Sequence, residues 1–260
     1  MTSASKRRVP LIAGNWKMHY TLAETQTLCQ TLVRELNDTR EVQVLIAPPF
    51  TSLQTAKSAL GNSGIALGAQ NCFYEDKGAF TGEISPPMLL DVGCSHVIVG
   101  HSERRQILLE DNATVARKFW ALRTHGLIPI LCVGETLDQR QQGQAQAVVL
   151  KQLDAVFAGA DAPKGHEFVV AYEPVWAIGT GQTATPNDAQ DMHRAIRQYL
   201  TERLGQDTAE QVRVLYGGSV KPDNALALAS EADVDGALVG GASLNAADFL
   251  AIVRATRQAG

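Results

Sequence analysis

The feature that most restricts the fold of this chain is an eightfold alternation of two kinds of segment. Short, nearly continuous apolar runs occur at residues 9–13, 42–47, 65–69, 96–99, 127–132, 168–172, 212–216 and 236–239. The longer stretches between them include residues 22–36, 145–157 and 189–204, and these carry apolar residues at helical spacing. Uninterrupted apolar runs suit strands that are buried on both faces, as in a parallel sheet. Eight strand–helix units in 260 residues therefore predict a single closed (β/α)8 barrel.

Local signals support helices after the strands. Thr185-Pro186-Asn187-Asp188 combines a cap residue, a proline suited to the first turn and an acidic residue near the positive end of a helix. Lys221-Pro222-Asp223 predicts another helix start. The alternative fold is a doubly wound open sheet, which would be expected to carry G-x-G-x-x-G after an early strand. No such motif follows an early strand, so the barrel is favoured.

Charge and composition narrow the classes of partner. No linker, low-complexity run or block of charge divides the chain, so residues 9–260 are expected to form one barrel domain. The formal net charge of −4 argues against nucleic acid or an anionic membrane, because both attract clustered basic residues. No apolar run approaches the ~20 residues that a membrane-spanning helix needs. Residues 1–8 are polar, lack the apolar stretch of a secretory signal and are expected to form a disordered tail.

The four cysteines, Cys29, Cys72, Cys94 and Cys132, form no C-x-x-C pair, and none stands with histidines at metal-ligand spacing. We expect reduced, buried thiols in a cytoplasmic protein that binds no metal. Cys132 lies near a strand end but has no obvious base partner, so we interpret it as a packing residue.

Polar residues follow several predicted strands at the edge where such barrels carry their chemistry. Asn15 and Lys17 follow the first strand, His101 follows the fourth and Glu173 follows the sixth. No other hydrogen-bonding use is obvious for all four at that edge. Their convergence indicates an active site.

Glycine pairs follow the last two strands. Gly217-Gly218 precedes Ser219, and Gly240-Gly241 follows the eighth strand. The N–H groups of such pairs can approach an anion closely, and barrels of this kind frequently hold a phosphate there. The sequence therefore predicts an anion site next to the four polar residues.

Each of these residues also has a plainer interpretation. Lys17 could be a solvated rim lysine. His101 could cap the next helix, although Ser102 is the better cap residue before Glu103. The glycine pairs could be ordinary turns, and the remaining histidines are interpreted as structural. Because independent coincidence at four strand ends is improbable, the active-site interpretation is favoured.

The segment after Glu173 departs from an ordinary loop. Its residues are Pro174, Val175, Trp176, Ala177, Ile178, Gly179, Thr180 and Gly181. Proline ends sheet pairing because it has no N–H to donate. An exposed loop normally avoids so much apolar surface unless it covers something part of the time, and its glycines can serve as hinges. The pattern indicates a catalytic base under a lid, and the alternative is a surface glutamate beside an ordinary turn.

The motifs at these positions resemble those of the triosephosphate isomerase family. They are Gly14-Asn15-Trp16-Lys17-Met18, Gln70-Asn71, Gly78-Ala79-Phe80-Thr81-Gly82-Glu83, Gly100-His101-Ser102-Glu103-Arg104-Arg105, the segment from Ala171 to Gly181, Tyr216-Gly217-Gly218-Ser219-Val220 and Gly240-Gly241-Ala242-Ser243-Leu244. The resemblance runs from Leu11 to about Ala255, and the lid segment is specific to that family. It implies the TIM-barrel fold and the reversible interconversion of dihydroxyacetone phosphate and D-glyceraldehyde 3-phosphate.

The resemblance also implies the role of each site residue. Glu173 would be the base, and burial under the closed lid is expected to raise its basicity. His101, at a helix start, would be a neutral hydrogen-bond donor to the developing oxyanion. Lys17 would supply a positive charge near that oxygen, with Asn15 beside it. The residues implied to bind the substrate and its phosphate are Asn15, Lys17, Gly179, Ser219, Gly240 and Gly241. The resemblance implies neither a cofactor nor a metal.

The segment 70–83, between the third strand and its helix, is too long for an ordinary barrel connection. In the family that the chain resembles, this loop reaches into a second subunit. We therefore expect a homodimer whose contacts include Gln70, Phe80, Thr81 and Glu83. The alternative is a mobile surface loop, which would leave three aromatic side chains exposed.

Two other functional classes stay open. A different phosphate-handling barrel enzyme would share the glycine pairs but would have no reason to combine Lys17, His101, Glu173 and the lid. A non-catalytic relative that binds only phosphate or a partner protein would be expected to have lost one of these three residues. A coupled isomerase assay without added metal distinguishes the classes.

Overall fold

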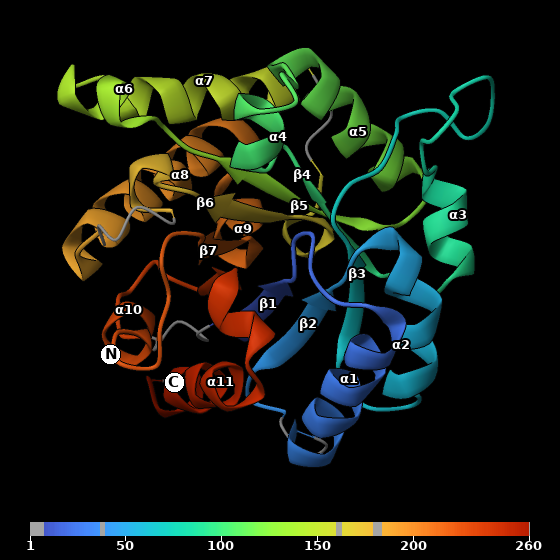
Figure 1. The fold of residues 1–260 in the computed structure, drawn as a ribbon. Helices are drawn as coiled ribbons and strands as arrows, with labels where there is room; N and C mark the ends of the chain where they lie inside the picture. Colours follow the sequence, from blue (N-terminus) through green and yellow to red (C-terminus); the bar gives the residue numbers. More distant parts are fainter. Residues whose placement is uncertain (1–7, 37–39, 160–162, 179–183, 260) are drawn as a thin grey trace.

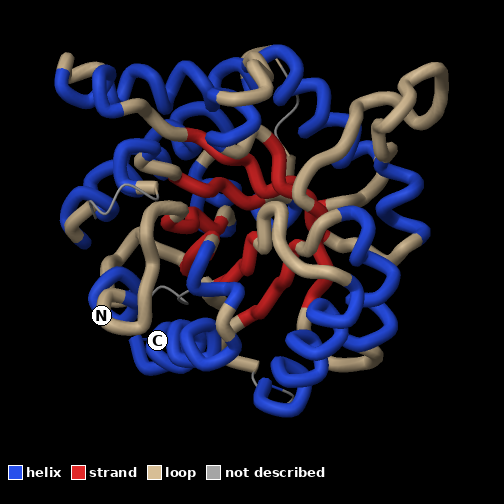
Figure 2. Tube along the Cα trace, viewed as in Figure 1, coloured by secondary structure: helices blue, strands red, loops and turns tan. Residues whose placement is uncertain are grey.

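Eight parallel strands form a closed barrel in which each strand pairs with its neighbours in the sequence (Figure 2). A computed structural model describes residues 8–36, 40–159, 163–178 and 184–259. The strands are β1 (Leu11–Asn15), β2 (Gln43–Ala47), β3 (Ala66–Ala69), β4 (His96–Val99), β5 (Ile128–Val133), β6 (Val169–Tyr172), β7 (Arg213–Tyr216) and β8 (Gly236–Val239). β1 pairs with β8 from Leu11 opposite Gly236 onward, which closes the ring. The predicted (β/α)8 barrel is confirmed.

The helices surround the strands as an outer layer (Figure 1). The α-helices are α1 (Leu22–Leu36), α2 (Leu53–Leu60), α3 (Pro86–Asp91), α4 (Ser102–Gln106), α5 (Asn112–Thr124), α6 (Leu137–Gln141), α7 (Ala145–Phe157), α8 (Pro186–Leu204), α9 (Gln206–Gln211), α10 (Ala225–Ala229) and α11 (Ala246–Ala259). The 3-10 helices are η1 (Phe50–Ser52), η2 (Gly165–Glu167), η3 (Val175–Ala177) and η4 (Gly241–Leu244). None of the helices in the described ranges combines the length and the apolar character that a membrane crossing needs.

The first strand lies two residues later than the sequence predicts. It was expected at 9–13, but β1 spans Leu11–Asn15. Val9 is 53% exposed, and Pro10 has no N–H for the ladder, although its carbonyl accepts a hydrogen bond from the N–H of Gln43. The shift matters for the site because it places Asn15 inside the strand rather than in the loop after it.

One helix start is confirmed and the other is displaced. The hydroxyl of Thr185 accepts the N–H of Asp188, whose carboxylate in turn accepts the N–H of Thr185, so α8 begins at Pro186 as its cap signal predicts. The signal at 221–223 does not begin a helix. A turn follows instead, because the side-chain oxygen of Asn224 accepts the Lys221 N–H, and α10 begins only at Ala225.

The barrel interior is filled by alternate residues of the strands. These inward residues are Leu11, Ala13, Leu45, Ala47, Ile98, Ile130, Cys132, Val169, Ala171, Leu215 and Leu238. The intervening strand residues pack outward against the helices in a second, larger core. Most strand residues on both faces are therefore apolar, which is why the strands appear in the sequence as nearly unbroken apolar runs. All four cysteines are buried and free, as expected.

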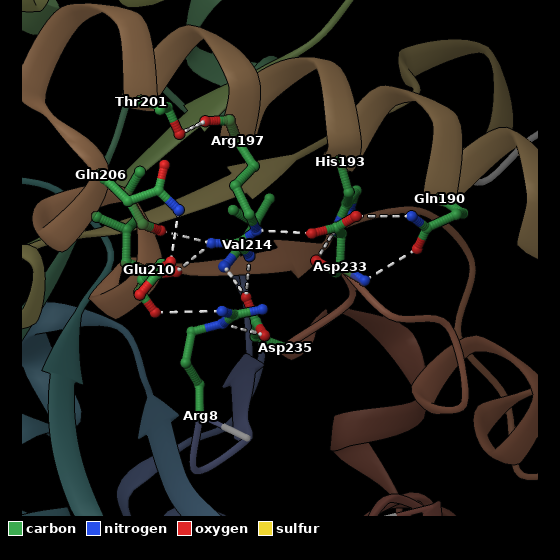
Figure 3. Close-up of polar contacts among 12 residues, drawn as sticks. Arg8, Gln190, His193, Arg197, Thr201, Gln206, Glu210, Val214, Asp233 and Asp235 are labelled. Atoms are coloured by element: carbon green, nitrogen blue, oxygen red, sulfur yellow. Dashed lines mark hydrogen bonds and ion pairs between the residues drawn. The ribbon is translucent and has the colours of Figure 1, made fainter. Parts of the chain in front are cut away.

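An ion-pair network ties the N-terminal end of the barrel together (Figure 3). Arg197 of α8 donates to Asp233 at 2.7 Å and to Asp235 at 2.6 Å, and Arg8 donates to Asp235 at 2.6 Å. Asp235 also accepts the N–H of Val214 at the start of β7. Arg8, the last residue of the expected tail, is thus held in place. Residues 1–7 lie outside the described residues, and the expectation of disorder there stays a prediction.

Two buried histidines make stability depend on pH. Burial lowers the pKa of His96 to about 3 and the pKa of His193 to about 4. Between an unfolded value of ~6.5 and those values, the unfolded chain binds more protons than the folded chain, so the free energy of unfolding should fall as pH falls. The slope should approach about 1.4 kcal/mol per pH unit for each histidine.

Urea unfolding at fixed protein concentration between pH 7 and pH 5 measures this slope. His193→Asn and His96→Asn should each remove part of the slope, whereas the exposed His166→Asn should not. A free energy of unfolding that stays constant over that range would contradict the prediction.

Candidate active site

The carboxyl ends of the strands bring the predicted residues to one cavity of about 720 Å³. Its lining includes Asn15, Lys17, His101, Glu173, Ile178, Gly217, Gly218, Ser219, Gly240 and Gly241. β1, β4, β6, β7 and β8 each contribute, although the residues are as far apart in sequence as Asn15 and Gly241. Residues that the sequence predicts to converge thus line one cavity, and their assignment as site residues stays a prediction.

Lys17 lies in a strained turn directly after β1. Its φ is 49°, in the left-handed region of backbone conformation that residues other than glycine rarely adopt. The Asn15 side-chain oxygen accepts its N–H at 3.0 Å, and Gln70 donates to its carbonyl at 2.7 Å. The ammonium group lies 2.6 Å from a carboxylate oxygen of Glu103. These contacts fix the backbone of the turn and aim the side chain into the cavity.

Glu173 is held against the start of α4. Its carboxylate accepts the Ser102 N–H at 2.9 Å and the Ser102 hydroxyl at 3.2 Å, and it lies 3.0 Å from Nε2 of His101. Only a glycine fits opposite it, because a Cβ on Gly134 would lie 1.8 Å from the Glu173 carbonyl oxygen. The side chain is 2% exposed.

The pKa of Glu173 in this arrangement differs from the expectation. Burial raises the pKa, but the charge and hydrogen bond of His101 and the hydrogen bonds from Ser102 and Cys132 lower it more, so it lies below its ordinary value. The expected rise in basicity is therefore not a property of this arrangement. The reason is that the buried carboxylate accepts hydrogen bonds that lower its pKa, whereas the expectation considered only the effect of burial.

His101, rather than Ser102, caps α4, which corrects the prediction that Ser102 is the cap. The helix begins at Ser102, and Nδ1 of His101 accepts the Glu103 N–H at 3.3 Å. Burial lowers the pKa of His101, but the negative charge of Glu173, its hydrogen bond and Glu103 raise it above the ordinary value. When the ring is neutral, the cap bond uses the Nδ1 lone pair, which places the proton on Nε2 and toward the cavity.

The first half of the expected lid is built around a buried carboxylate. Pro174 comes directly after Glu173, and Val175–Ala177 form η3. Trp176 Nε1 donates to Glu135 at 2.9 Å, and the Tyr172 hydroxyl donates to the same oxygen at 3.0 Å. Ile178 lines the cavity. Gly179, Thr180 and Gly181 lie outside the described residues.

The family model for triosephosphate isomerase matches residues 10–256. The chain is 52% identical over 246 residues to triosephosphate isomerase of Chloroflexus aurantiacus, covering 95% of this chain and 98% of that protein. It is 54% identical over 247 residues to the same enzyme of Herpetosiphon aurantiacus, covering 95% and 99%, and 53% identical over 246 residues to that of a Roseiflexus species, covering 95% and 97%. The chain belongs to the triosephosphate isomerase family. The resemblance seen from Leu11 to about Ala255 is thereby confirmed.

The candidate site also depends on residues to which the sequence assigned no part in it. Ser102 holds the candidate base, Glu135 holds Trp176, and Arg140 lies with its guanidinium 4.5 Å from the Trp176 ring centroid. Arg140 also pairs with Asp188 at 2.6 Å, at the start of α8. The only sequence signal for Glu135 was its position after β5. Within the described ranges, no three His, Cys, Asp or Glu side chains gather as a metal site would.

Proposed function

We propose that this chain is a triosephosphate isomerase that interconverts dihydroxyacetone phosphate and D-glyceraldehyde 3-phosphate through an enediolate. The observation that carries the proposal is the convergence of Lys17, His101 and Glu173 from three strand ends on one cavity. A proton transfer between adjacent carbons needs a base, a hydrogen-bond donor at the carbonyl oxygen and stabilisation of the negative charge. These three side chains supply all three requirements.

Glu173 is the base in this proposal. Where it lies, burial raises its pKa, but His101 and Ser102 lower the pKa more. To face the substrate carbon, the carboxylate must move away from the Ser102 N–H and hydroxyl. It then loses two hydrogen-bond donors while it stays buried. Since desolvation then acts with fewer compensating hydrogen bonds, the basicity of the carboxylate rises where the proton is taken.

His101 is the donor to the substrate oxygen. Its cap bond to the Glu103 N–H does not depend on where Glu173 lies, so Nε2–H stays directed into the cavity when the carboxylate moves. Without the adjacent negative charge, burial and the start of α4 favour the neutral ring. Lys17 adds a fixed positive charge, and Asn15 adds a polar side chain next to it.

The phosphate site of the proposal lies after β7 and β8. Ser219, Gly240 and Gly241 line the cavity, and the predicted contribution of Gly179 lies outside the described residues. A Cβ on Gly240 would lie 3.3 Å from Lys17 Cε, so the lysine stem passes directly against this glycine. Backbone N–H groups and one ammonium group suit a phosphate dianion.

A coupled assay with each triose phosphate, without added metal, tests the proposal. Isomerisation in both directions is the expected result. A protein that binds phosphate without isomerising either substrate would be a non-catalytic relative, and activity only on another sugar phosphate would assign it to a different barrel enzyme.

We also propose that the chain acts as a homodimer in the cytoplasm. Figure 1 shows the loop between β3 and α3 projecting from the barrel, and in it Phe73 packs on Phe80 with ring centroids 4.5 Å apart. Phe80 is 42% exposed, Met18 is 95% exposed and Leu109 is 81% exposed. Apolar side chains this exposed on loops beside the site support a partner surface that covers them.

Charging this loop should separate the subunits and weaken the enzyme. We expect the double variant Phe80→Asp, Thr81→Arg to sediment as a monomer. Because Gln70 at the base of the loop donates to the Lys17 carbonyl, the loop and the lysine turn are coupled. kcat should then fall by roughly tenfold or more, since small displacements of catalytic groups cost on the order of 10²-fold.

Sedimentation velocity and activity as a function of protein concentration give the two readouts. Leu226→Asp, which charges an exposed apolar residue of α10, is the matched control and should change neither. A monomer with full activity would contradict the coupling of assembly to catalysis.

A further inference from the structure

Tyr20 occupies a backbone conformation that a tyrosine does not favour. Its φ is 77°, in the left-handed region where glycine is unstrained and an aromatic residue is uncommon. It closes the turn that begins at Lys17, whose φ is also positive. Because a glycine would relieve the strain at position 20, contacts of the tyrosine side chain must offset it.

The side chain of Tyr20 makes two such contacts. Its ring meets the Trp16 ring edge-on, with centroids 5.4 Å apart and an interplanar angle of 83°. Its hydroxyl donates to the backbone carbonyl of Leu244. Burial, with a smaller contribution from Glu24, raises the pKa of Tyr20, so the hydroxyl keeps its proton and stays a donor.

These contacts join the lysine turn to the short helix that begins at the glycine pair. Lys17 lies three residues before Tyr20, and Leu244 is the last residue of η4 (Gly241–Leu244). The same two segments meet again through Ser243, whose hydroxyl lies 2.7 Å from the Gly240 carbonyl and 3.5 Å from the Asn15 carbonyl. The tyrosine hydroxyl therefore connects Tyr20 to Leu244, the last residues of two segments. The first residues of these segments, Lys17 and Gly240, line the cavity.

We propose that Tyr20 is a positioning residue that sets the spacing between the Lys17 ammonium group and the N–H groups of Gly240 and Gly241. The proposal rests on the proposed function, in which these groups share one substrate phosphate. The tyrosine does not touch the reacting carbons. Its effect is on the fit of a phosphate-bearing ligand and is nearly the same in the ground state and the transition state.

Tyr20→Phe keeps the ring contact and removes only the hydroxyl. We expect KM for both triose phosphates and the inhibition constant for inorganic phosphate to rise together, by roughly three- to tenfold, which is the effect of one lost hydrogen bond. kcat should change by less than about twofold, because the lost interaction stabilises the bound substrate and the transition state equally. The kcat/KM for D-glyceraldehyde, the substrate without its phosphate, should be unchanged.

Two further variants separate positioning from stability. Tyr199→Phe removes another tyrosine hydroxyl, which donates to Asp154 at 3.1 Å on the outer helices, and it should leave all four constants unchanged. Tyr20→Gly relieves the backbone strain, and it should weaken phosphate binding at least as much as Tyr20→Phe, whatever its melting temperature.

Unchanged KM and phosphate inhibition in Tyr20→Phe would overturn the proposal, and so would an equal loss with D-glyceraldehyde. Failure of the proposed function is a different result. It would appear as the absence of isomerase activity in the parent protein, before any change at position 20.

Discussion

Replacing Glu173 by glutamine should lower kcat by at least 10²-fold and up to 10⁴-fold, while KM for the triose phosphates changes little. Glutamine keeps the size of the side chain but cannot take a proton. Its carbonyl oxygen can still accept the Ser102 N–H that Glu173 accepts at 2.9 Å, so the resting arrangement and the fold should be retained. Steady-state kinetics in both directions, with the melting temperature recorded in parallel, give the measurement.

Glu202→Gln is the matched control for this variant. Glu202 lies on α8, where its carboxylate accepts a hydrogen bond from Gln198 on an exposed face, and its replacement should leave kcat unchanged. If Glu173→Gln kept more than about a tenth of the parent activity, the proton would have to be taken by another group.

The fold was predictable because its segments are periodic. α1 and α7 have the bounds that their apolar spacing predicts, and β4 and β8 have the bounds of their apolar runs. Two of the misplaced boundaries lie where one side chain decides the local hydrogen bonding. Pro10 delays β1, and the amide of Asn224 delays α10. Apolar periodicity carries no information about such single hydrogen bonds.

The site was predictable in position but not in detail. Parallel strands bring their carboxyl ends together, so Asn15, Lys17, His101 and Glu173 had to meet once the strands were identified. Which donor holds the carboxylate depends on side-chain conformation across β4 and β6, and the sequence does not encode it locally. The contact of Glu173 with Ser102 and the cap formed by His101 are therefore findings of the structure. The roles came from the family resemblance.

The lid segment is anchored at both ends by one cluster of charges. Trp176 in η3 donates to Glu135, and Arg140 lies over the Trp176 ring and pairs with Asp188. Asp188 also accepts the N–H of Thr185, the residue before α8. These anchors belong to the barrel and its helices, so they remain in place when residues between them are removed. A variant that lacks residues 178–181 should therefore fold with nearly the parent stability.

Such a variant should isomerise more slowly by roughly 10²-fold, because water reaches the charges in the cavity and weakens their effect on the transition state. It should also release inorganic phosphate in a much larger share of turnovers. The enediolate can expel its phosphate when the C–O bond rotates out of the enediolate plane, since the electron pair of that bond then leaves with the phosphate oxygen. We propose that the closed lid holds the phosphate in the plane and excludes water.

The measurement is the ratio of phosphate released to triose isomerised, which distinguishes loss of the intermediate from a lower rate of isomerisation alone. Glu173→Gln is the control, because it is also slow but leaves the lid unchanged and should keep the parent ratio. If the shortened variant were slow with the parent ratio as well, the segment would assist the chemistry without containing the intermediate, and the lid proposal would be wrong.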